Sequence, residues 1–152
     1  MTTLETPEFA LTLEDDWIRH GSDVADRHLF ESVLRDTSLT ILVESMLTPG
    51  EDLEPVARKL ADHRIEGHLT AAQTHGWLFE MTEPQIIARE FGQVVSYEGR
   101  LLAGGRFAFT GLVLTTGVVS LLVESDTASQ QALSETLMEV ASGMEIEPSP
   151  HG

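Results

Sequence analysis

The residues in this chain that could do chemistry gather first around one acidic turn. Glu14, Asp15 and Asp16 stand next to one another, and His20 follows four residues after Asp16. Carboxylates and an imidazole can serve as general acid, general base or Ca²⁺ ligands. A calcium loop, however, needs alternating oxygen ligands around a central glycine over about twelve residues, and this turn lacks that pattern. A solvated acidic turn is therefore the simpler interpretation, with ligand or acid–base chemistry at Asp15, Asp16 and His20 as an alternative.

The six histidines of the chain do not follow a metal-binding pattern. No two of them lie four residues apart, as ligands on one helix face do, and the sequence H-E-x-x-H is absent. The chain has no cysteine, which excludes disulfides, thiolate nucleophiles and cysteine-based metal sites. It also lacks a P-loop, a nucleophile elbow and a dinucleotide-binding glycine pattern. We therefore expect no enzyme activity, no cofactor and no bound metal.

The charge balance is the unusual property of the composition. The chain has 25 acidic residues against 9 basic ones, a formal net charge of -16. Such a charge repels phosphate backbones and anionic lipids, and it favours solubility and basic partners. We therefore expect neither nucleic-acid binding nor membrane insertion. The N-terminus shows no basic region followed by an apolar stretch, so we expect no secretory signal and a cytoplasmic protein.

One tetrapeptide, Leu-Val-Glu-Ser, occurs twice and each time ends an apolar strand pattern. The copies lie at 42–45 and 122–125. The first precedes a helical pattern near 52–66, whose apolar residues recur at helical spacing and which Gly67 is placed to end. The second precedes another helical pattern near 128–142. Two similar strand-then-helix units therefore organise the chain.

Further strands complete an α+β pattern. Alternating or β-branched stretches predict them at 9–13, 28–35, 39–46, 77–79, 86–97, 106–114 and 118–125. Glu98-Gly99 is expected to form a turn. The whole predicts a largely antiparallel sheet of about five to seven strands with two main helices packed on one face. A single domain over 8–146 would lie between a flexible N-terminus, 1–7, and a flexible tail, 147–152.

Alternation along the strands predicts which side chains lie under the helices. On each strand, the row of side chains with the larger apolar groups would face both helices. These residues are Leu39, Ile41, Val43, Phe107, Phe109, Val113, Val119, Leu121 and Val123. The opposite face would then expose Leu42, Leu112, Leu114 and Leu122. A large exposed apolar patch usually marks an interaction site, so we predict that these four leucines bind a partner protein. Cover by the N-terminal segment or by residues 68–90, a homodimer formed through this face, and a small-ligand pocket are the alternatives.

The order of these features resembles a known family. The stretch Phe9-x-Leu11-x-Leu13-x3-Trp17 is similar to the start of PsbP-like and DcrB-like α/β-sandwich proteins, where a strand leads through a turn to a tryptophan. The hairpin, helix, antiparallel strands and C-terminal helix that follow are also similar, over about residues 8–146. Small acidic members of this group resemble the effector-associated chaperones of type VI secretion. That resemblance implies a non-enzymatic dimer that shields apolar, transmembrane-like helices of a toxin before export.

The leading hypothesis is a non-catalytic cytosolic adaptor or chaperone for a secreted protein, acting as a homodimer. It would bury an apolar partner segment against the uncovered sheet face. A second hypothesis is a small-ligand-binding or enzymatic domain that uses the Asp15, Asp16 and His20 turn. A third is a type III secretion chaperone, a class that is also small, acidic and α+β. A fold alone does not choose among these functions.

Overall fold

The computed structural model describes residues 2–5, 9–21, 27–45, 53–76, 79–90, 92–101, 105–114 and 117–146. The strands in chain order are β1 (Thr2–Glu5), β2 (Phe9–Leu13), β3 (Trp17–His20), β4 (Arg27–Ser32), β5 (Thr37–Ser45), β6 (Phe79–Met81), β7 (Gln85–Arg89), β8 (Gly92–Leu101), β9 (Arg106–Leu114), β10 (Gly117–Ser125) and β11 (Met144–Ile146). The helices of this described part are α1 (Leu53–His75) and α2 (Gln130–Ser142).

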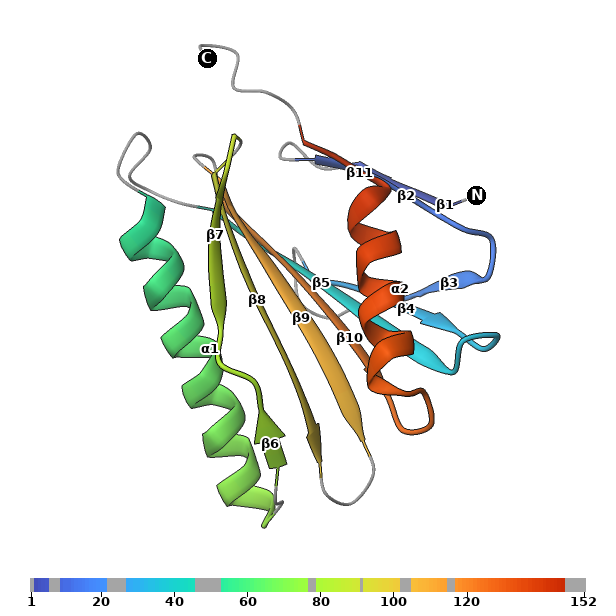
Figure 1. Cartoon of the computed structure of the whole chain (residues 1–152). Helices are drawn as coiled ribbons and strands as arrows, with labels where there is room; N and C mark the ends of the chain where they lie inside the picture. Colours follow the sequence, from blue (N-terminus) through green and yellow to red (C-terminus); the bar gives the residue numbers. More distant parts are fainter. Residues whose placement is uncertain are drawn as a thin grey trace.

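The strands form a large and a small antiparallel sheet (Figure 1). The large sheet has eight strands in the order β3-β4-β5-β10-β9-β8-β6, and β7 also pairs with β8. The small sheet has the order β1-β2-β11. The α+β class is therefore confirmed, with a larger sheet than expected. The predicted first strand, Phe9–Leu13, is β2 and belongs to the small sheet rather than to the main one.

The two helices lie on opposite faces of the large sheet, so the prediction that both pack on one face is wrong. Under α1, Ala57 and Ala61 join a cluster with Val95 and other residues of β8, β9 and β10. Under α2, Leu133 joins a separate and larger cluster, which includes Leu11 of the small sheet. Figure 1 shows the large sheet between the two helices. The small sheet and α2 thus form a second layer on one side only.

The register of the β9–β10 hairpin explains this error. Strand β9 ends at Leu114 and β10 begins at Gly117, so only two residues connect them. Leu122 consequently pairs with Phe109, and Val119 pairs with Leu112. A shift of one residue in register moves a whole row of side chains to the other face. The grouping of Phe109 with the odd-numbered residues of β10 fails for that reason.

Helix α1 runs well past Gly67, where the sequence pattern predicted its end. The reason is packing beyond that residue: His68 stacks on the ring of Phe107 with 4.8 Å between centroids, and its Nε2 lies 3.0 Å from the hydroxyl of Tyr97. The helix ends instead before Gly76, whose φ of 69° is the left-handed conformation that glycine adopts readily. Tertiary contacts therefore override the weak helix preference of Gly67.

Two further boundaries differ from expectation. Residues 2–5 form β1, which pairs with β2 from Thr2↔Leu13 to Glu5↔Ala10, so a strand lies before residue 8. Strand β8 runs straight through Glu98 and Gly99, where a turn was expected. A side chain at Gly99 would lie 2.6 Å from the ring of Phe107, so glycine makes room for that ring. The predicted tail, 147–152, and the predicted strand residue Trp77 lie outside the described residues.

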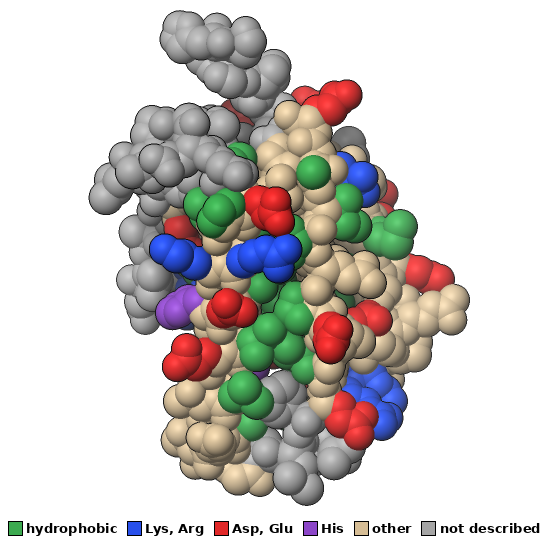
Figure 2. All heavy atoms as spheres, turned by 60° about the vertical axis from the view of Figure 1, so that its left-hand side comes forward, with side chains coloured by type: hydrophobic (Ala, Val, Ile, Leu, Met, Phe, Trp, Pro, Cys, Tyr) green, Lys and Arg blue, Asp and Glu red, His purple; other side chains and the backbone are tan. Residues whose placement is uncertain are grey.

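The outer surface of α1 is polar. Figure 2 brings this side of the molecule forward and shows hydrophobic side chains gathered between acidic and basic ones. Leu69 of α1 is an exposed apolar residue, with 48% of its surface exposed. Within the described residues, neither helix combines the length and the apolar composition that crossing a membrane requires.

Candidate functional site

The four leucines predicted to bind a partner lie on two different faces. Leu112 and Leu114 are buried in the cluster beneath α2, with 6% and 3% of their surface exposed. Leu42 and Leu122 point to the other face, beside α1, and are half-buried. The four side chains therefore do not form one uncovered surface, and that part of the prediction is wrong. Leu112 and Leu114 are core residues.

The structure instead leaves a cleft between α2 and the large sheet. Helix α2 packs on β9 and β10, whereas β8 and β7 continue beyond its reach. Figure 1 shows α2 and β7 on either side of β8 and β9. The cleft has a volume of about 360 Å³ and is lined by Thr82, Glu83, Gln85, Ser96, Tyr97, Glu98, Ala108, Phe109, Thr110, Ser134, Leu137, Met138 and Ala141. This volume falls in the range of ordinary ligand sites.

Helical and strand periodicity place the lining side chains. Ser134, Leu137, Met138 and Ala141 follow one another at i, i+3, i+4 and i+7, so they share one face of α2. Met138 stands out on this wall, because it lies at the rim with 72% of its surface exposed. On β8, Ser96 and Glu98 line the cleft and Val95 packs under α1, whereas Tyr97 belongs to the cluster under α1 and also borders the cleft.

Hydrogen bonds fix an acidic group at one end of the cleft. Ser134 Oγ donates to Glu98 Oε2 at 2.6 Å, and Gln130 Nε2 lies 3.4 Å from the same oxygen. The backbone is held as well: the Thr82 N–H donates to the Glu98 carbonyl at 2.9 Å, and the Glu98 N–H donates to Thr82 Oγ1 at 3.0 Å. Glu83 follows directly and also lines the cleft. This end is therefore acidic and ordered.

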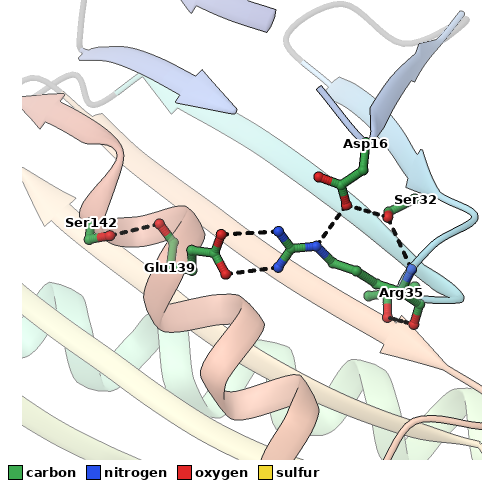
Figure 3. Close-up of polar contacts among 6 residues, drawn as sticks. Asp16, Ser32, Arg35, Glu139 and Ser142 are labelled. Atoms are coloured by element: carbon green, nitrogen blue, oxygen red, sulfur yellow. Dashed lines mark hydrogen bonds and ion pairs between the residues drawn. The ribbon is translucent and has the colours of Figure 1, made fainter. Parts of the chain in front are cut away.

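The predicted acidic turn connects neighbouring elements of the fold through hydrogen bonds. Asp16 Oδ2 accepts hydrogen bonds from Ser32 Oγ at 2.6 Å and from Arg35 Nε at 2.8 Å. The other guanidinium nitrogens of Arg35 donate to both carboxylate oxygens of Glu139 on α2, at 2.9 and 3.0 Å (Figure 3). Arg35 also lies over Trp17, 5.5 Å from the ring centroid. The network fastens α2 to the β3 turn and the β4–β5 hairpin.

The charges in this network shift one another's titration. The hydrogen bonds from Arg35 hold the pKa of Asp16 and that of Glu139 below their usual values. The two carboxylates in turn raise the pKa of Arg35. Each carboxylate is thus stabilised in its ionised form, and the cation that pairs with Asp16 is the guanidinium of Arg35 in the same chain.

His20 does not meet Asp16. It lies 3.2 Å from Glu31, with about half of each side chain exposed (51% and 56%), on the face of β3 opposite buried Trp17. Asp16 and His20, two residues of the second hypothesis, are thus engaged with different partners, Arg35 and Glu31. Among the described residues, no group of three or more His, Asp or Glu side chains is arranged to hold a metal ion.

The remaining titratable cluster lies beneath α1. Burial lowers the pKa of His68 and raises that of Tyr97. Tyr97 also stacks on Phe109, with ring centroids 4.7 Å apart. These shifts follow from packing in the core of the α1 face, although Tyr97 and Phe109 also border the cleft.

Sequence reasoning missed the residues that shape the cleft. The second helical pattern, predicted near 128–142, spans Leu137, Met138 and Ala141, but none of these residues was predicted to line a site. An exposed methionine next to a helical stripe was the available signal. Ser96 and Thr110 gave no sequence signal of this kind, since hydroxyl residues in strands are common and their neighbours depend on the strand register.

Comparison with known proteins supports the fold. No protein-family model and no curated protein matches this chain. Among solved structures, it is similar to the solution structure of cyanobacterial PsbP (CyanoP) from Synechocystis sp. PCC 6803, with a TM-score of 0.67 and 12% sequence identity. The likeness covers 96% of this chain and 92% of that one. The expected PsbP-like fold is thereby confirmed, and at this identity the likeness concerns the fold alone.

Proposed function

We propose that this protein is a non-catalytic adaptor or chaperone that holds an apolar segment of a partner protein in the cleft between α2 and the large sheet. The observation that supports this most is the open cleft of about 360 Å³ with Met138 exposed on its rim. Methionine adapts its shape to varied apolar side chains and is common on surfaces that bind several partners.

The cleft is already formed in the free chain. Ser129 caps the start of α2 by accepting from the Ala132 N–H, and Arg35 fastens its last turns through Glu139. Glu98 and Ser134 join the helix to the floor. A preformed site loses little conformational entropy when a partner binds, which favours affinity. Burial of Met138 against a partner would contribute roughly 25 cal/mol for each Å² of apolar surface removed from water.

The partner we propose is a secreted protein, with an exported type VI effector as the candidate that the family resemblance suggests. Its apolar segments need cover before export, and an acidic carrier with a net charge of -16 stays soluble while it provides that cover. The arrangement needs no reacting group, and the acidic turn is already committed to Arg35.

A labelling experiment tests the proposal. The chain has no cysteine, so a single introduced cysteine can carry benzophenone maleimide without side reactions. The label is placed by Met138→Cys in the cleft and, as the matched control, by Glu135→Cys on the exposed surface of the same helix. The purified, labelled protein is added to an extract of the native host and irradiated, and the captured protein is identified. Its segment is then purified and titrated against the wild type and the Met138→Asp variant.

We expect capture from position 138 but not from 135, an apolar captured segment, and weaker binding by Met138→Asp. Equal capture at both positions would contradict the proposal. So would a purified segment that binds the Met138→Asp variant as tightly as the wild type.

A further inference from the structure

The cleft is polarised along its length. Its acidic end is formed by Glu98, which Ser134 and Gln130 hold in place, and by Glu83. The α2 wall becomes apolar at Met138 and Ala141, one and two turns further along the helix, while the strands opposite contribute the hydroxyls of Ser96 and Thr110. A ligand that fills the whole cleft therefore meets a carboxylate at one end and the apolar helix wall beyond it.

Simple geometry gives the spacing between the two ends. Four residues of helix separate Ser134 from Met138, a rise of about 6 Å. In an extended chain, side chains two residues apart point the same way and are separated by about 6.5 Å. An extended segment that inserts alternate side chains matches this spacing.

Charge decides which extended segment fits. The carboxylates of Glu83 and Glu98 would have to lose water on binding, and an unpaired charge in a covered site is unfavourable. A basic side chain next to them removes that cost. A second copy of this chain is a poor occupant, because two molecules that each carry a net charge of -16 repel one another.

We propose that the cleft selects an extended partner segment in which an Arg or Lys lies two residues from a large apolar side chain. The basic group pairs with Glu98 and Glu83, and the apolar side chain packs on Met138. The inference rests on the proposed function and adds a rule for which segments are accepted. The acidic end of the cleft would then select the partner segment by its charge, and the apolar end would supply most of the contact area.

Two synthetic peptides test this rule. The first is acetyl-Leu-Ser-Arg-Ser-Leu-amide, which presents the pair in either chain direction, and the second has Gln in place of Arg. Both are titrated by NMR against the wild type, Glu98→Gln, Glu83→Gln and the control Glu135→Gln, whose carboxylate lies outside the cleft and accepts from Gln131. We expect the Arg peptide to bind about threefold more tightly than the Gln peptide, as for a partly exposed ion pair.

The ratio of the affinities of the Arg peptide and the Gln peptide should fall from about three towards one in Glu98→Gln and in Glu83→Gln. It should stay at about three in Glu135→Gln. Binding of both peptides in the cleft with equal affinity for the wild type would overturn the selection rule and leave the proposed function standing. If neither peptide changes the amide signals of 134–141, the rule and the placement of the binding site in this cleft are both refuted. High salt should weaken only the Arg preference, since it screens charge.

Discussion

Replacing Arg35 by methionine removes the centre of the network that fastens α2 to the sheet. Methionine is similar in length and keeps an apolar stem against Trp17, so the change deletes mainly the charged hydrogen bonds. Asp16 then loses its cation, and Glu139 loses a bidentate partner. The variant therefore reports what the charged contacts contribute to stability.

The magnitude follows from how exposed each pair is. The side chains of Arg35 and Asp16 are only 21% and 14% exposed, and a hydrogen bond to a charged group contributes about 1.5–3 kcal/mol. The carboxylate of Glu139 is 51% exposed, and such a surface pair contributes about 0.2–1 kcal/mol. Because contributions within one network are not additive, we expect the free energy of unfolding to fall by about 2–4 kcal/mol.

Urea unfolding of the wild type and Arg35→Met at several pH values is the assay. The pKa of Asp16 and of Glu139 is lowered in the folded state, so their contribution is fully present above their unfolded pKa values of about 4. It is lost as the pH falls through the lowered, folded-state values. The difference between the two proteins should therefore be large at neutral pH and should shrink below about pH 4. Glu139→Gln, as a partial control, should cost less than Arg35→Met.

A stability difference below about 0.5 kcal/mol at neutral pH, which is typical of neutral surface substitutions, would refute this reasoning. A difference that stays constant down to acid pH would also refute it, because the loss would then come from packing rather than from the charges.

Two further pairs of variants test the helix boundary and the face assignment. Gly67→Ala should stabilise the protein by about 0.5–1 kcal/mol, since its new methyl group meets no atom within 4 Å. Gly76→Ala should destabilise the protein, because φ is +69° at that position. Thermal unfolding measures both variants, and a stabilising Gly76→Ala would contradict the structure. Leu112→Asp should cost more than about 4 kcal/mol and unfold the domain, while Leu122→Asp, on the half-buried strip beside α1, should leave it folded. Circular dichroism distinguishes these outcomes, and a folded Leu112→Asp would show that the core beneath α2 is placed wrongly.

Much of the fold could be predicted because the local patterns were strong. The strands β9 and β10 and the helix α2 followed directly from β-branched runs and from a helical pattern near 128–142. The end of α1 did not, because Gly67 resembles a stop signal, and only the contacts of His68 with Phe107 and Tyr97 explain why the helix continues. Local propensity could not reveal those contacts.

The placement of side chains on the two faces depended on one uncertain quantity, the number of residues in the β9–β10 turn. A two-residue connection pairs Leu122 with Phe109, and a three-residue connection would have paired residues of equal parity. The candidate site was missed for a related reason. The cleft arises where α2 stops covering the sheet, and that position is set by Arg35 and Glu98, which hold the helix from opposite sides.

Hydrogen–deuterium exchange of the protein with and without its purified partner segment tests the central proposal most directly. Binding in the cleft predicts slower exchange of amides in 134–141 of α2 and in 96–98 of β8, which border it. Slower exchange confined to β3, β4 and β5, around Leu42, with α2 unchanged, would contradict the account and move the binding surface to the other face of the sheet.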